Sequence, residues 1–217
     1  MKFARDICMS ALTRLSWALR RNPARFLFSD ENFKRVTGGE RDEVEFLQRR
    51  WSSDGGGGIW DVGASLGKYT CDIARANPNC KIFAFEPNLN SLYFLAHRTA
   101  RFPNIEIVPC ALTADGREMK GSYEPNFNAP ATGPLVPTFS IAEALAKFGK
   151  PVFIKMDVEG EEFKIFREQA GLLRGIHLLV EWHTFFMKDP IPPLKHWRVH
   201  EAFPNHTYLE PLAEKNL

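Results

Sequence analysis

The sequence is poor in cysteine and lacks any long apolar run. Its four cysteines, at positions 8, 71, 80 and 110, form no C-x-x-C pair. Cysteines scattered in this way argue against a disulfide framework and predict reduced thiols in a cytoplasmic protein. No stretch approaches the roughly 20 apolar residues of a membrane-spanning helix, so the sequence predicts no transmembrane segment.

An excess of one charge is also lacking. The chain has 28 Lys and Arg against 26 Asp and Glu, and the basic residues form no long run. A protein that follows a phosphate backbone usually carries a basic patch or stripe. The charge distribution therefore does not indicate nucleic acid as a partner. With 217 residues, 44% of them hydrophobic, the chain is long enough to bury one sizeable core.

The N-terminal part is predicted to be a helical extension, residues 1–54, ahead of a domain at residues 55–217. Residues 1–21 place apolar side chains on one helical stripe, but charged residues interrupt the run. The segment is too charged for the core of a signal peptide. It is expected either to dock on the domain or to lie on a membrane surface or partner as a basic amphipathic helix.

The most informative stretch is IWDVGASLG, Ile59 to Gly67. It predicts a buried strand, a tight loop and the start of a helix, with Gly63 and Gly67 allowing close backbone approach to a ligand. A dinucleotide site would use G-x-G-x-x-G to hold a pyrophosphate. Here Asp61 stands where the first glycine belongs. A carboxylate repels pyrophosphate and attracts the sulfonium and amino groups of S-adenosylmethionine, so the loop predicts that methyl donor.

The second predicted strand ends in an acid, Glu86, followed by Pro87 and Asn88. An acid at this place can accept both hydroxyl groups of a ribose. After the third strand, the backbone at Ala111 is placed to meet an adenine edge. The predicted donor-binding residues are Asp61, Gly63, Ser65, Gly67, Glu86, Pro87, Asn88, Ala111 and Asp157.

Polar side chains close two later strands. Lys155 and Asp157 share one face of a strand whose apolar pattern predicts a central position, and Glu181 and His183 share a face at the end of the strand Ile176–Glu181. Burial of charge is costly, and open α/β sheets bind ligands at the carboxyl ends of strands. A functional pocket is therefore expected there. If the strands are neighbours, Lys155 and Glu181 form a buried ion pair, and Asp157 and His183 face the pocket.

The remaining elements are predicted from local patterns. Ser140 and Glu143 form a capping box that starts a helix. The proline-rich stretch 122–137 is a long loop, either a lid or substrate-binding segment or a plain surface excursion. Near the end, Lys195–Phe203 is expected to be a helix and His206–Glu210 a sixth strand. A seventh strand is doubtful.

Three glutamates follow Asp157. Glu161 and Glu162 open the helix Glu161–Leu173, where they complement the positive end of the helix dipole. Both are interpreted as structural. For Glu159, a structural and a functional role remain open.

The successive motifs resemble those of the FkbM-type methyltransferase family. They are IWDVGASLGKYT, FAFEPN, TFSIAEAL, FIKMDVEGEEF and LLVEWH, and they span about Ile59 to His183. The resemblance implies an α/β, Rossmann-like class I methyltransferase with a mainly parallel central sheet flanked by helices. It implies S-adenosylmethionine-dependent O-methylation of a sugar, glycan, lipid-linked saccharide or secondary metabolite. The matching positions are Asp61, Gly63 and Gly67 in the donor loop, Glu86 at the ribose, and Lys155, Asp157, Glu159 and Gly160 in the late motif.

Transfer of a methyl group to a hydroxyl requires alignment and removal of a proton. The predicted catalytic residues are Asp157, His183 and Lys155, with Asp157 or His183 as the base. A divalent metal ion held by Asp157, Glu181 and His183 is a variant. The alternatives are a non-catalytic adenosine-binding module and, less favoured, an amino methyltransferase of nucleic acid. The acceptor and the oligomeric state remain open.

Overall fold

A computed structural model describes residues 57–120, 135–184, 190–203 and 206–213, together with Leu47 and Trp51. The predicted amphipathic helix at residues 1–21 lies outside the described residues. So does the long loop at 122–137, apart from its last three residues. Membrane contact through the extension and a domain boundary near residue 54 therefore stay predictions.

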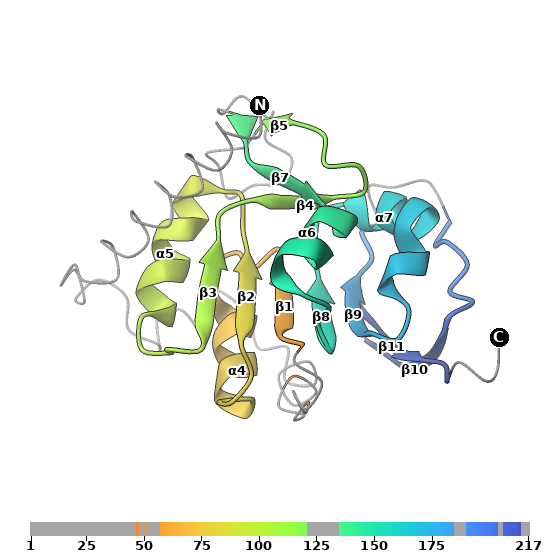
Figure 1. The fold of residues 1–217 in the computed structure, drawn as a ribbon, viewed down its shortest axis with the longest axis horizontal. Coiled ribbons are helices and arrows are strands. Elements are labelled where there is room, and N and C mark those ends of the chain that lie inside the picture. Colours follow the sequence, from red (N-terminus) through yellow and green to blue (C-terminus); the bar gives the residue numbers. More distant parts are fainter. Residues whose placement is uncertain are drawn as a thin grey trace.

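One seven-stranded sheet forms the centre of the molecule, in the order β10-β11-β9-β8-β1-β2-β3 (Figure 1). Its strands are β1 (Ile59–Val62), β2 (Ile82–Phe85), β3 (Ile105–Val108), β8 (Phe153–Met156), β9 (His177–Glu181), β10 (Trp197–Phe203) and β11 (His206–Pro211). The strands β3, β2, β1, β8 and β9 are parallel to one another, whereas β11 runs antiparallel to both β9 and β10. The chain enters the sheet at β1 and adds β2 and β3 on one side of it. It then returns and adds β8 and β9 on the other side of β1. Such a switch point is where open α/β sheets bind their ligands.

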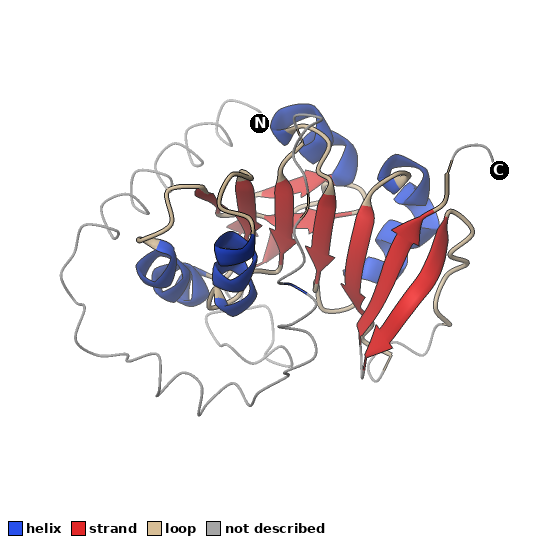
Figure 2. Ribbon diagram, turned by 90° about the horizontal axis from the view of Figure 1, so that it is seen from below, coloured by secondary structure: helices blue, strands red, loops and turns tan. Residues whose placement is uncertain are grey.

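Helices cover both faces of the sheet (Figure 2). The helices α4 (Lys68–Ala76) and α5 (Leu89–Thr99) pack with Ile59 and Ile82 on one face. On the other face, α6 (Ile141–Phe148) and α7 (Glu161–Gln169), which continues into the 3₁₀ turn η1 (Ala170–Leu173), pack with Trp60 and Phe85. Alternate residues of the parallel strands thus bury their side chains in two separate cores, as the apolar strands predict.

Two small strand pairs lie beyond the carboxyl ends of the main strands (Figure 1). One joins β4 (Ala111–Thr113) to β7 (Thr138–Ser140), and the other joins β5 (Met119–Lys120) to β6 (Leu135–Val136). The start of α6 confirms the predicted capping box. The Ser140 hydroxyl accepts from the Glu143 N–H at 3.2 Å, and the Glu143 carboxylate accepts from the Ser140 N–H at 2.9 Å.

The end of the chain corrects two predictions. The segment expected to be a helix, Lys195–Phe203, contains the strand β10, and this strand is the seventh member of the sheet. Its backbone pairs with β11 from Trp197↔Pro211 to Phe203↔His206. The Trp197 indole is buried and donates to the Ile176 carbonyl at 3.0 Å. Antiparallel pairing with the next strand therefore outweighs the helical pattern of the segment.

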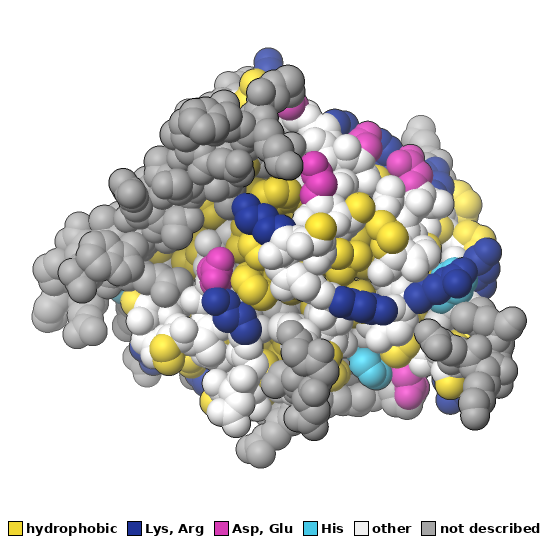
Figure 3. All heavy atoms as spheres, viewed as in Figure 1, with side chains coloured by type: hydrophobic (Ala, Val, Ile, Leu, Met, Phe, Trp, Pro, Cys, Tyr) yellow, Lys and Arg dark blue, Asp and Glu magenta, His cyan; other side chains and the backbone are white. Residues whose placement is uncertain are grey.

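In the part of the chain that the structure describes, Cys71, Cys80 and Cys110 are buried and are not joined in disulfide bonds. None of the described helices has the length and apolar character needed to cross a bilayer. On the face shown in Figure 3, the Lys and Arg side chains are spread over the described surface and do not merge into one basic patch.

Candidate active site

The carboxyl ends of β1, β2, β8 and β9 bring together most of the residues that the sequence singles out. Lys155 is the central one. Its ammonium group is 3.0 Å from Asp157 Oδ2 and 3.9 Å from Asp61 Oδ1, and it donates to the Gly63 carbonyl at 3.2 Å. The Tyr69 ring lies 5.2 Å from the same nitrogen. The buried ammonium group of Lys155 thus contacts β1, the loop that follows β1 and the end of β8.

Burial opposes the charge of Lys155, but its acidic neighbours prevail. Burial lowers the pKa of the lysine, and Asp157 and Asp61 together more than offset that effect and raise it. The ammonium group therefore stays charged although the side chain is almost fully buried.

The Asp61 side chain is buried and is not exposed to solvent at the loop between β1 and α4. Its carboxylate is fully buried and accepts from the Thr70 hydroxyl at 2.5 Å. Burial raises its pKa, opposed by Lys155 and the Thr70 hydrogen bond. Its Oδ1 atom has no hydrogen-bond partner. Direct contact between Asp61 and a ligand stays a prediction, while its contact with Lys155 is part of the structure.

The loop between β1 and α4 needs its two glycines. Gly63 has a φ angle of +78°, and a Cβ atom there would lie 1.7 Å from the Asp157 carbonyl oxygen. Gly67 has a φ angle of +81° and begins α4, where a Cβ atom would meet the Leu95 side chain. Ser65 also takes a positive φ, 48°, and is exposed. Both positions require glycine because of their positive φ angles. Gly63 also needs it because the Asp157 carbonyl lies so close, and Gly67 because Leu95 does.

Glu86 closes β2 directly beside this loop. Its two carboxylate oxygens accept backbone hydrogen bonds from Ser65 and Asn88, each at 2.7 Å. Burial raises the pKa of Glu86 to about 7, although these hydrogen bonds and Lys155 act in the opposite direction. A carboxylate oxygen has more than one lone pair, so both oxygens can still accept hydroxyl groups.

The other predicted donor-site residues have structural contacts of their own. The Asn88 side chain caps α5 by accepting from the N–H groups of Asn90 and Ser91. Pro87 connects Glu86 to this cap and is partly buried. The Ala111 N–H, expected near an adenine, donates to the Pro137 carbonyl at 2.9 Å. Contact between any of these residues and a donor stays a prediction.

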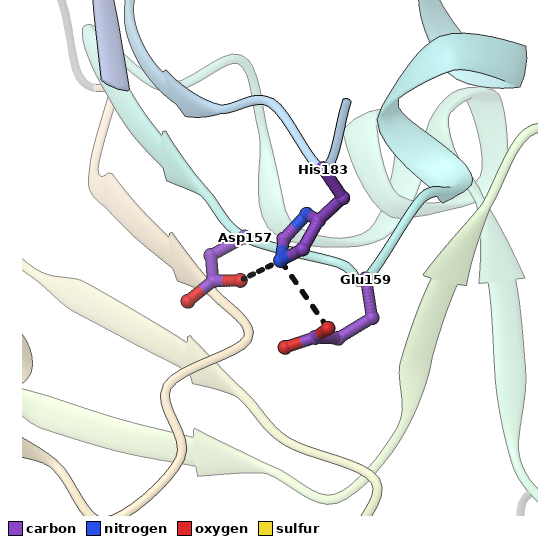
Figure 4. A group of neighbouring side chains, drawn as sticks. All are labelled: Asp157, Glu159 and His183. Atoms are coloured by element: carbon purple, nitrogen blue, oxygen red, sulfur yellow. Dashed lines mark ion pairs between the residues drawn. The ribbon is translucent and has the colours of Figure 1, made fainter. Parts of the chain in front are cut away.

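His183 extends from the loop after β9 toward two carboxylates that follow β8 (Figure 4). Its Nε2 atom lies 3.2 Å from Glu159 Oε2 and 3.7 Å from Asp157 Oδ1. Its Nδ1 atom lies 2.9 Å from Glu162 Oε1. The predicted pair of Asp157 and His183 therefore does meet, and two glutamates complete the group.

These carboxylates determine the charge of His183. Burial lowers the pKa of the imidazole, but the hydrogen bonds with Glu159 and Glu162 outweigh burial and raise the pKa to about 10. The ring is therefore an imidazolium at neutral pH. The sequence alone predicts a pKa near neutrality for His183, the range of an unperturbed histidine.

Glu181 does not join the site, contrary to two predictions. Its carboxylate contacts His206, with Oε2 at 3.2 Å from Nε2, and the buried ion pair with Lys155 does not form. In the parallel register Lys155 lies opposite Leu179, so Glu181 stands two residues beyond it. Glu159 takes its place in the acidic group. Ligand atoms of Asp157, Glu159 and His183 lie within 4.8 Å of one another, the separation at which three side chains can hold a metal ion.

Acids outnumber bases at this sheet edge. The acids are Asp61, Glu86, Asp157, Glu159 and Glu162, and the cationic side chains among them are Lys155 and His183. The local sequence pattern leaves the role of Glu159 open and predicts that Glu162 complements the helix dipole. The resemblance already includes Lys155, Asp157, Glu159 and Gly160 in its late motif, but not the extension to Glu162. The full spacing, K-x-D-x-E-G-x-E, places four charged side chains around one strand end.

Two comparisons of the sequence with known proteins agree on the family. The family model described as Methyltransferase FkbM domain matches residues 61–208. The chain is 26% identical over 157 residues to a hexuronic acid methyltransferase, AglP, of Haloferax volcanii, covering 67% of this chain and 63% of that protein. The chain thus spans somewhat less than two thirds of that relative.

Solved methyltransferase structures are similar only at a distance. A methyltransferase FkbM from Methylobacillus flagellatus KT aligns with a TM-score of 0.44 and 16% identity over 76% of this chain and 47% of that one. A precorrin-6y C5,15-methyltransferase from Geobacter metallireducens GS-15 aligns with a TM-score of 0.45 and 15% identity over 86% and 89%. The family match rests on the sequence and covers more than half of the chain. The chain therefore belongs to the FkbM methyltransferase family, and its mainly parallel sheet flanked by helices confirms the predicted α/β, Rossmann-like fold.

Proposed function

We propose that the protein is an S-adenosylmethionine-dependent O-methyltransferase that acts on a hydroxyl of a sugar or glycan. The observation that carries the proposal is the excess of acid at the switch point of the sheet. Acidic side chains at the ends of the strands favour a cationic donor over a dinucleotide, whose pyrophosphate they would repel. The sugar class is supported by the similarity to a hexuronic acid methyltransferase.

In this proposal the donor lies across the loop from Gly63 to Gly67, with its ribose on Glu86. When bound, S-adenosylmethionine supplies a methyl group that its sulfonium has already activated. The chain must then hold the acceptor oxygen in line and take its proton. Orientation of this kind contributes up to about 7–11 kcal/mol to lowering a barrier.

Asp157 is the proposed base. Its Oδ1 atom is buried, has no hydrogen-bond partner and faces His183, while Oδ2 accepts from Lys155. Because the raised pKa of His183 keeps a proton on the ring at neutral pH, the histidine is better suited to donate than to accept. Lys155 holds Asp157 and carries no proton from the substrate.

The proposal needs no metal ion. Both ring nitrogens of His183 already contact carboxylates, one with Glu162 and one with Glu159. Activity that is removed by EDTA and restored by Mg²⁺ would instead make Asp157, Glu159 and His183 metal ligands.

The function is tested first by calorimetric titration with S-adenosylmethionine and S-adenosylhomocysteine, with NAD as the control ligand. We expect saturable binding of the first two alone. A second step incubates labelled S-adenosylmethionine with glucuronic acid and its glycosides. Because a hexuronic acid offers both hydroxyl and carboxyl groups, mild alkali separates the products, since it cleaves a methyl ester and leaves an ether. Binding without transfer to any acceptor would favour the adenosine-binding module.

Glu86→Ala is expected to weaken donor binding by roughly 10- to 100-fold, the loss of hydrogen bonds to a charged group. Calorimetry of the variant measures the change. Glu106→Ala is the matched control, since Glu106 lies on the neighbouring strand β3 and forms a surface ion pair with Lys81. Unchanged affinity in the Glu86 variant would remove this residue from the ribose site.

Donor binding is also expected to depend on pH through Glu86. Its pKa is raised to about 7 by burial, so the carboxyl gains a proton as the pH falls below 7 and loses acceptor capacity. The affinity should fall by up to about tenfold for each pH unit below 7 and level off above it. Binding at neutral pH should release a proton, detected by titration in buffers of different ionisation enthalpy. A flat profile in the wild-type protein would contradict the ribose role.

A further inference from the structure

Glu162 has an unusual environment for a residue in the first turn of a helix. Glutamates at this position commonly point to solvent and complement the helix dipole. The Glu162 side chain is instead fully buried below the start of α7. Its neighbour Glu161 behaves differently, because it accepts from the Ala114 N–H and pairs with Arg117 at the surface.

Three hydrogen-bond donors converge on the Glu162 carboxylate. Oε1 accepts from the His183 backbone N–H at 3.0 Å and contacts the His183 Nδ1 atom at 2.9 Å. Oε2 accepts from the Gly160 N–H at 2.8 Å. Since a carboxylate only accepts, Nδ1 must carry the hydrogen of the ring contact.

The contact with Nδ1 fixes which nitrogen of His183 faces the acidic group. With Nδ1 held by Glu162, Nε2 is the atom directed at Glu159 and Asp157 (Figure 4). A histidine is commonly oriented in this way by the partner of its second nitrogen. Rotation of the ring would break the Glu162 contact and remove Nε2 from the site.

The same carboxylate also holds the turn that carries Glu159. Glu159 and Gly160 have φ angles of 55° and 102°, both in the left-handed region. For Glu159 this conformation is uncommon and needs support from its surroundings. The hydrogen bond from the Gly160 N–H to Glu162 supplies that support on one side of the turn.

We propose that Glu162 is a positioning residue of the methyl-transfer site, which aligns both His183 and Glu159 with Asp157 through one buried carboxylate. The inference rests on the proposed function, because it assigns these three side chains to the reaction. Glu162 itself need not touch the substrate.

The chemistry requires a carboxylate at this position. All three partners of Glu162 are donors, and an amide of the same size offers one acceptor oxygen and one donor group. In Glu162→Gln, at least one donor must therefore face an NH₂ group. If the oxygen turns to Gly160, the ring contact is lost; if it turns to His183, the Glu159 turn loses its hydrogen bond.

The orientation is measured by NMR on the full chain labelled with ¹⁵N-histidine, with His183→Asn to assign the signal. In the wild-type protein we expect one slowly exchanging, downfield-shifted N–H proton on the Nδ1 atom of His183. Its absence would overturn the proposal without any variant. In Glu162→Gln the signal should move upfield and exchange faster, because a neutral amide oxygen is a weaker acceptor even when it still faces His183, and in Glu161→Gln it should keep its wild-type position. The control removes the same charge from the same helical turn, so equal changes in both variants would return Glu162 to a helix-dipole role.

Kinetic measurements then distinguish a loss of side-chain positioning from a loss of protein stability. Glu162→Gln should lower kcat by about 10- to 100-fold, as loss of a supporting carboxylate typically does, with the KM for S-adenosylmethionine unchanged. Glu161→Gln should stay near the wild-type kcat. An unchanged kcat in Glu162→Gln would overturn the inference. Failure of the proposed function would appear separately, as absence of S-adenosylmethionine binding to the wild-type protein.

Discussion

Asp157→Asn is expected to slow methyl transfer by about 10²- to 10⁴-fold while the protein stays folded and binds its donor. The substitution keeps the size of the side chain and an oxygen that can accept from Lys155, 3.0 Å away. It removes the negative charge that faces His183 and would take the acceptor proton. A positioned base contributes about 10²- to 10⁴-fold, so kcat should fall by that factor. The rate is measured with the sugar acceptor found in the labelling screen, and the donor affinity by calorimetry.

Two further variants sharpen this test. Asp157→Ala should be at least as inactive as the asparagine variant, because it also removes the partner of Lys155. Asp115→Asn is the matched control, since Asp115 forms surface ion pairs with Arg117 and Lys164, away from β8. Turnover at the wild-type rate in Asp157→Asn would exclude Asp157 as the base and direct attention to Glu159, the other carboxylate beside Nε2 of His183.

The parts of the fold that the sequence predicts well are those set by local interactions. The strand–loop–helix unit around Gly63 and Gly67 depends on apolar spacing and on two residues that tolerate positive φ. The start of α6 depends on the reciprocal hydrogen bonds of Ser140 and Glu143. Each device works within a few residues, so its signature is present in the sequence itself.

The errors concern the pairing between strands. β10 is a strand because β11, the next strand in the chain, supplies its hydrogen bonds and also pairs with β9, and the pattern of residues 195–203 taken alone does not show this pairing. Glu181 was expected beside Lys155 on the basis of alternation along one strand, but the register between β8 and β9 places Leu179 there. Alternation identifies the face on which a side chain lies, and register decides its neighbour.

The acidic site shows the same division. The sequence identified Lys155, Asp157 and His183, because polar residues at the ends of apolar strands are conspicuous. It could not show that Glu162 lies buried under His183 while Glu161 reaches Arg117. Adjacent residues in the first turn of a helix point in different directions, and only the packing of α7 against the sheet decides which of them is buried.

Lys155→Met is expected to destabilise the fold by about 3–5 kcal/mol, the usual cost of removing one partner of a buried ion pair. Lys155 is almost fully buried between Asp61 and Asp157. Without it, the Asp61 carboxylate keeps only the hydrogen bond from Thr70, and two acids remain close to each other without a cation between them. Such a loss is a large part of the 5–15 kcal/mol that typically stabilises a domain. Urea-induced unfolding measures it.

A second substitution tests whether the uncompensated charge of Asp61 causes this loss. In Lys155→Met with Asp61→Asn, the amide can still accept from the Thr70 hydroxyl, and one uncompensated charge is gone. The double variant should therefore be more stable than Lys155→Met alone, although methionine fills the space of the lysine stem in both. Lys164→Met, which removes a surface ion pair with Asp115, should leave the unfolding midpoint nearly unchanged. If the double variant is no more stable than the single one, the uncompensated charge of Asp61 does not cause the loss, which would then be assigned to the closer pair of Lys155 with Asp157.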